Sequence, residues 1–191
     1  LNLIRLMMYI GLPIAVGTTI IGSSLIVLVY DTTFLPAALP LKIVIWSIAL
    51  AFLNLPMVMF LSSIEKQKQA TIIIGIGAIF NVIFNFILIP EYGMVGAATT
   101  TVISQIIILY FCSRRIIECL DQISWQPILA QSLTGSLGMA LVLLVLPDMH
   151  AILLIIFGAM SYLTIMIIIG AVNRKDWQDI LHLFNPTRSR V

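Results

Sequence analysis

The chain has 191 residues, of which 61% are hydrophobic and 9% are charged, and its formal net charge is +2. Soluble domains are about 25% charged, so this composition excludes an ordinary water-exposed globular fold. The basic residues lie in short breaks between apolar runs, where they act as topology signals, and nucleic-acid binding has no support. Because the chain starts with leucine, we expect it to be a segment of a longer protein.

Six apolar runs follow one another along the chain, and each is long enough to cross a bilayer. A helical span needs about 20 residues at a rise of 1.5 Å each. In lipid every backbone amide must be paired within its segment, so runs of this length predict helices. The fold class is therefore predicted as an all-α polytopic membrane protein. The predicted spans are residues 6–30, 42–63, 70–89, 94–113, 128–147 and 151–172.

The first span contains a proline and follows a basic residue. Pro13 removes a backbone hydrogen bond and favours a helix kink. Arg5 is expected to reach the cytoplasmic head groups along its aliphatic stem. A second interpretation gives Arg5 a contact with an anionic, lipid-linked head group. Thr18 is a candidate for lining a cavity or acting in gating.

The next three spans contain uncharged polar residues in apolar surroundings. Asn54 precedes Pro56, a second predicted kink, and Gln105 lies in the middle of the fourth span. Asn81 and Asn85 are four residues apart, so they share one face of the third span. Two interpretations stay open for these residues: hydrogen bonds between helices, or contact with substrate in a water-filled cavity.

A tight turn is predicted between the third and fourth spans, at Pro90-Glu91-Tyr92-Gly93. Pro90 is expected to end one helix, since it cannot donate a backbone hydrogen bond. Gly93, Ala97 and Thr101 recur every four residues and predict a packing face along the next helix.

The last 19 residues, 173–191, are predicted to be a cytoplasmic tail. Their apolar residues recur with the period of an amphipathic helix that lies in the membrane interface. These apolar residues are Trp177, Ile180, Leu181 and Phe184.

The charges predict an orientation in the plasma membrane, with both ends of the chain cytoplasmic. One side of the membrane receives nine basic residues and the other receives only Lys42, which is the asymmetry of the positive-inside rule. The opposite breaks instead contain Asp31, Glu91 and Asp148. The nine basic residues are Arg5, Lys66, Lys68, Arg114, Arg115, Arg174, Lys175, Arg188 and Arg190.

Features typical of an enzyme are missing from the sequence. The two histidines, His150 and His182, fall on opposite predicted sides of the membrane, so they cannot share a metal ion. No carboxylate lies inside a predicted span, and no phosphate-binding GxxxxGK loop occurs. We therefore predict no catalytic residues, no metal site and no cofactor. No charged residue lies deep within a predicted span either.

Three stretches resemble a known family. Residues 81–98, NVIFNFILIPEYGMVGAA, resemble a signature of the polysaccharide-biosynthesis flippases. These proteins belong to the superfamily of multidrug, oligosaccharidyl-lipid and polysaccharide exporters. Residues 34–42, FLPAALPLK, resemble the entry into that family's eighth helix, and residues 12–15, LPIA, resemble the start of its seventh.

The resemblance implies that residues 1–172 form the carboxy-terminal lobe, six helices, of a two-lobe exporter. It implies that the partners are membrane lipid and the missing amino-terminal lobe, and that the substrate is a lipid-linked oligosaccharide flipped from the inner to the outer leaflet. The lobes would rock to give alternating access. Two alternatives stay open: a cation-coupled multidrug exporter of the same superfamily, and a non-transporting membrane scaffold.

Overall fold

The computed structural model describes residues 2–118, 126–146 and 150–171, and every regular element in these residues is helical. The prediction of an all-α membrane fold is confirmed. The predicted amphipathic tail, 173–191, lies outside the described residues. The elements are α1 (Asn2–Tyr30), η1 (Thr32–Ala37), α2 (Ala38–Ser63), α3 (Gln67–Ile117), α4 (Gln126–Val145) and α5 (Ala151–Ile168).

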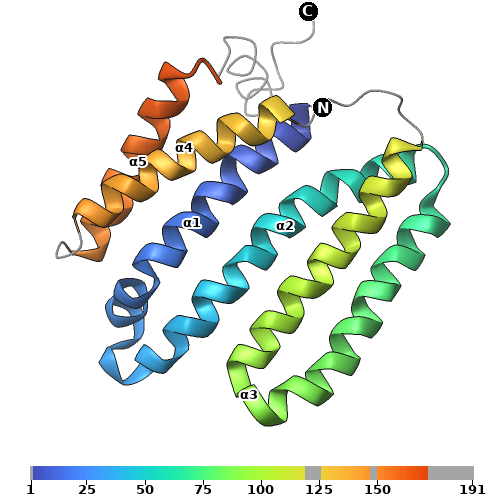
Figure 1. Cartoon of the computed structure of the whole chain (residues 1–191), viewed down its shortest axis with the longest axis horizontal. Coiled ribbons are helices and arrows are strands. Elements are labelled where there is room, and N and C mark those ends of the chain that lie inside the picture. Colours follow the sequence, from blue (N-terminus) through green and yellow to red (C-terminus); the bar gives the residue numbers. More distant parts are fainter. Residues whose placement is uncertain (1, 119–125, 147–149, 172–191) are drawn as a thin grey trace, which may run out of the picture.

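The helices run up and down beside one another, as Figure 1 shows. The most extensive contacts join α1 to α2 and α4, α2 to α3, and α4 to α5. The segments Leu3–Tyr30, Thr32–Ser63, Gln67–Ile117 and Ala151–Ile168 are long and apolar enough to cross a membrane. The apolar part of α4, Leu129–Val145, is shorter.

The helix α3 contains both the third and the fourth predicted spans. Its 51 residues would reach about 75 Å if straight, more than twice the roughly 30 Å of hydrocarbon. The chain instead reverses at Gly93, where φ is 54° and ψ is −130° (Figure 1). We call residues 67–92 the first arm of α3 and residues 94–117 the second arm. Pro90 lies inside the first arm, so the helix does not end there as predicted.

The reversal at Gly93 depends on glycine, because side-chain-bearing residues rarely adopt this backbone conformation. Three residues later the two arms meet at Gly96. A Cβ atom built on Gly96 would lie 2.4 Å from the carbonyl oxygen of Leu88 in the first arm. The hairpin therefore closes through direct contact of one backbone with the other.

Two apolar cores hold the helices together. The first core lies between α1, α4 and α5, and the second lies between α2 and the two arms of α3. The first consists of Ile21, Met139, Leu143, Leu154, Tyr162, Met166 and Ala171. The second consists of Met57, Leu61, Ala70, Ile73, Ile108, Cys112 and Ile116.

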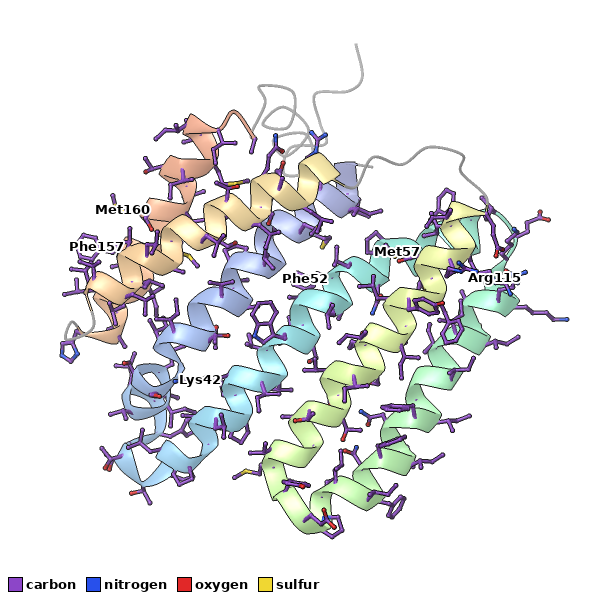
Figure 2. All side chains as sticks on the ribbon, in the orientation of Figure 1. Lys42, Phe52, Met57, Arg115, Phe157 and Met160 are labelled. Carbon is purple, nitrogen blue, oxygen red and sulfur yellow. The ribbon has the colours of Figure 1, made fainter. Side chains whose placement is uncertain are left out.

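Charges separate toward the two ends of the bundle. Four basic residues lie in the connection from α2 to α3, in the first turn of α3 and in its last turn, and α1 begins at this same end. We call it the basic end. Lys42 lies near the opposite end (Figure 2). Which end faces the cytoplasm stays a prediction. The four residues are Lys66, Lys68, Arg114 and Arg115.

Candidate functional site: an apolar groove and a polar network

The first turns of α1 are tied to α4 and α5 by hydrogen bonds around a proline. Pro13 has no N–H, so the carbonyl of Tyr9, four residues earlier, loses its helical donor. The hydroxyl of Tyr162 in α5 donates to this carbonyl at 2.8 Å. The Tyr9 hydroxyl donates to Gln131 Oε1 in α4 at 2.6 Å. A backbone acceptor freed by the proline thus becomes a contact between α1 and α5.

One further contact completes this attachment. The hydroxyl of Ser132 in α4 donates to the carbonyl of Met8 at 3.1 Å, and Ser132 is fully buried. The sequence pattern indicates a role for Pro13 but not for Tyr9, Tyr162 or Gln131. Pro13 itself indicates that such a donor is needed. A buried carbonyl four residues before a proline has lost its helical donor and needs a hydrogen bond from another part of the protein.

A groove of about 480 Å³ follows α1 beyond this attachment, between α1, α4 and α5. Two of the predicted residues, Pro13 and Thr18, line it. Gly17 and Gly158 are among its lining residues, and a Cβ on Gly17 would meet only Met139, at 3.5 Å. The lining is almost wholly apolar, so the groove suits a hydrocarbon chain. Its lining residues on α1 are Tyr9, Ile10, Pro13, Ile14, Gly17, Thr18, Ile21 and Leu25.

The other polar residues singled out in the sequence lie elsewhere, in a network between α2 and α3. Asn54 in α2 donates to the Gln105 side chain at 2.8 Å and to the Gln105 carbonyl at 3.1 Å. Because a backbone carbonyl only accepts, the orientation of the Asn54 amide is fixed. Its Oδ1 is then buried without a hydrogen-bond partner among the described residues.

The two asparagines of the third predicted span form a separate set of hydrogen bonds within α3, between its two arms. Asn85 donates to Asn81 Oδ1 at 2.9 Å. Asn81 in turn lies 3.5 Å from the Thr101 hydroxyl and 3.4 Å from the Ser104 hydroxyl in the second arm. Asn54, Asn81, Asn85 and Gln105 therefore all contact neighbouring helical residues, and none of them lines the groove.

The last two predicted residues lie apart from both features. Arg5 is half-buried in α1 near the basic end. Pro56 is buried in α2, two residues beyond Asn54, and the helix continues past it from Ala38 to Ser63. No group of three His, Cys, Asp or Glu side chains comes together within the described ranges.

We expect replacement of both Asn81 and Asn85 by leucine to destabilise the protein modestly. Hydrogen bonds between membrane helices contribute about 0.6 kcal/mol on average and up to about 1.7 kcal/mol. The melting temperature of the purified double variant should fall slightly, and its folded yield should remain near that of the native protein. A loss of transport at normal folded yield would instead place these residues in the substrate path.

The all-helical fold and its long apolar helices define a multi-pass membrane protein. A solved structure shares this fold: the lipid II flippase MurJ in its inward closed conformation, with a TM-score of 0.76 and 18% sequence identity. The match covers 88% of this chain and 38% of the MurJ chain. At this identity the likeness shows the fold alone.

A curated relative is an uncharacterized membrane protein, MJ1068, of Methanocaldococcus jannaschii. It is 35% identical over 101 residues, which are 52% of this chain and 20% of the relative. No protein-family model matches the sequence. The chain thus spans about one fifth of this relative and less than two fifths of the MurJ chain.

Proposed function

We propose that this chain is part of a transporter that flips a lipid-linked oligosaccharide between membrane leaflets. The observation that carries the proposal is the shared fold with MurJ, whose name describes a flippase of a lipid-linked molecule. The resemblance of residues 81–98 to polysaccharide-biosynthesis flippases supports the same class of substrate. In this proposal the chain is the carboxy-terminal lobe, and an amino-terminal lobe completes the transport path by alternating access.

The groove between α1, α4 and α5 fits the lipid part of such a substrate. Its lining extends along α1 from Tyr9 to Leu25, about 24 Å at 1.5 Å per residue. One leaflet of hydrocarbon is only about 15 Å thick. A groove of this length is longer than one leaflet and reaches past the middle of the bilayer, which favours a long polyprenyl carrier over an ordinary acyl chain.

The proposal also divides the polar residues between two roles. Asn54 and Gln105 join α2 to α3, Asn81 and Asn85 stabilise the α3 hairpin, and the groove contains Thr18 and Pro13. The sugar head group then crosses the membrane between the two lobes, while its chain stays in apolar surroundings. This separation avoids the cost of moving unpaired hydroxyl groups through hydrocarbon.

Translocation of a fluorescent lipid-linked oligosaccharide tests the proposal in proteoliposomes that contain the full-length protein. We expect Gly17→Leu to reduce flipping at least several-fold, since its side chain fills the groove beside Met139. Gly75→Leu is the matched control, because a Cβ on Gly75 meets nothing within 4 Å.

Three outcomes discriminate between the hypotheses. No flipping by the native full-length protein, with efflux of hydrophobic cations, would favour the multidrug exporter. Neither activity in a folded protein would favour the scaffold. Normal flipping by Gly17→Leu would leave the proposed function standing but remove the groove from the path. Residues 1–191 alone should not flip the substrate, because a single lobe cannot enclose it.

A further inference from the structure

Lys42 is the single charged residue of α2 and lies inside an apolar span. The predicted span 42–63 begins at Lys42, so the sequence places this residue at the edge of a span. In the structure the helix starts at Ala38, one turn earlier, and η1 extends the apolar segment back to Thr32. Lys42 therefore lies about 6 Å inside α2 at 1.5 Å per residue. Because α2 has 26 residues and is about 39 Å long, this position lies near the edge of the roughly 30 Å of hydrocarbon, at the level where lipid head groups begin.

The side chain of Lys42 lies across α1, where a glycine makes room for it. A Cβ atom built on Gly22 would lie 3.1 Å from Lys42 Cγ and 3.4 Å from Lys42 Cε. Both ends of the aliphatic stem therefore rest on the backbone of α1, and Lys42 is half-buried. Figure 2 shows Lys42 between α1 and α2, near the end of the bundle opposite Arg115. This position places the aliphatic stem of Lys42 at the seam between α1 and α2.

No carboxylate of the described residues forms an ion pair with Lys42. The nearest acidic residue along the chain, Asp31, is engaged locally. Its Oδ1 accepts from the backbone N–H of Thr32 at 2.6 Å and from the Thr32 hydroxyl at 3.2 Å. A half-buried cation in an apolar span is costly unless an anion meets it. The protein itself supplies no such anion within the described ranges.

An aromatic residue lies one turn further along the same face of α2. Trp46 is four residues after Lys42, so the two side chains are neighbours. The indole N–H of Trp46 donates to the Thr19 hydroxyl of α1 at 3.1 Å. This bond holds the ring between α1 and α2, where 36% of Trp46 stays exposed. A cation next to an exposed aromatic surface suits a molecule that has both an anionic group and an apolar chain.

We propose that Lys42, resting on Gly22 and beside Trp46, binds the phosphate of a membrane amphiphile at the end of the bundle opposite the basic end. The ammonium group forms charge-assisted hydrogen bonds with phosphate oxygens, and the Trp46 ring contacts the first carbons of the chain. The phosphate belongs either to a bilayer phospholipid or to a lipid-linked substrate. The site does not depend on the proposed transport.

Native mass spectrometry of the full-length protein in detergent tests this site with three probes: phosphatidylglycerol, a polyprenyl diphosphate and diacylglycerol, which has no phosphate. We expect Lys42→Met to reduce retention of at least one phosphate probe by about tenfold, as the loss of one charge-assisted hydrogen bond predicts. Lys42→Arg should retain the probe within about threefold, because the positive charge remains. Retention of diacylglycerol should not change.

Two further variants separate the site from general charge effects. Lys68→Gln removes an exposed charge at the basic end and should leave retention unchanged. Gly22→Ala keeps the charge but occupies the space under the Lys42 stem, so it should weaken retention. A loss confined to phosphatidylglycerol identifies a phospholipid site, and a loss confined to the polyprenyl diphosphate identifies a carrier site. Equal retention of both phosphate probes by native protein and Lys42→Met would overturn the proposal.

Discussion

Replacement of Gly96 by alanine is expected to destabilise the α3 hairpin severely. The added Cβ would lie 2.4 Å from the carbonyl oxygen and 2.8 Å from the carbonyl carbon of Leu88. Both atoms belong to the backbone of the first arm, so the clash cannot be relieved by rotation of a side chain. Overpacking of this kind costs about 3 kcal/mol. We expect a several-fold loss of folded protein, measured by size-exclusion chromatography after detergent extraction.

The chain provides a matched control for this variant on the same helix. A Cβ on Gly75, also in the first arm, meets nothing within 4 Å. Gly75→Ala makes the same chemical change and favours the helix by up to about 1 kcal/mol. Its folded yield should equal or exceed that of the native protein. If Gly96→Ala behaved like Gly75→Ala, the two arms would not approach as closely as the structure shows.

The second large effect is expected at the attachment of α1 to α5. Tyr162→Phe removes the hydroxyl that donates to the Tyr9 carbonyl, beside Pro13. Loss of this bond should lower the free energy of unfolding by about 1–2 kcal/mol. Pro13→Ala restores a backbone N–H that can donate to the same carbonyl. In the Pro13→Ala background, Tyr162→Phe should therefore cost less than about 0.5 kcal/mol.

Thermal unfolding of the two single variants and the double variant measures this coupling. Tyr110→Phe is a suitable control, because Tyr110 is 59% exposed in the second arm of α3. It removes the same atom and should have almost no effect. An equal cost of Tyr162→Phe in both backgrounds would show that its hydroxyl acts through a group other than the Tyr9 carbonyl.

Asn81 and Asn85 show which features of the polar residues can be predicted from the sequence and which cannot. Their spacing placed Asn81 and Asn85 on one face of a helix, and the structure has them hydrogen-bonded to one another at 2.9 Å. Spacing left open whether that face met a cavity or another helix. The hairpin at Gly93 folds Thr101 and Ser104 of the second arm back toward Asn81, so part of this face meets another helix. Contact of the same face with substrate stays a prediction.

Pro13 and Lys42 also show that the sequence does not reveal contacts between distant helices. The sequence predicted that Pro13 would remove a backbone hydrogen bond, but the replacement donor, Tyr162, is 153 residues away from Tyr9. The predicted spans 6–30 and 42–63 leave residues 31–41 between them and place Lys42 at the edge of a span. The structure adds η1 and the first turn of α2 there, and the side chain rests on Gly22 of another helix.

The all-α membrane class of this protein follows from the amino-acid sequence without any knowledge of packing. Runs of about 20 apolar residues must pair their own backbone groups in lipid, and this is a local property of each run. The packing of the helices was needed to show that Thr18 and Pro13 line a groove, that Asn54 of α2 meets Gln105 of α3, and that Lys42 lies at a helix seam. These facts depend on which helix packs beside which, and contacts between residues far apart in the chain settle that choice.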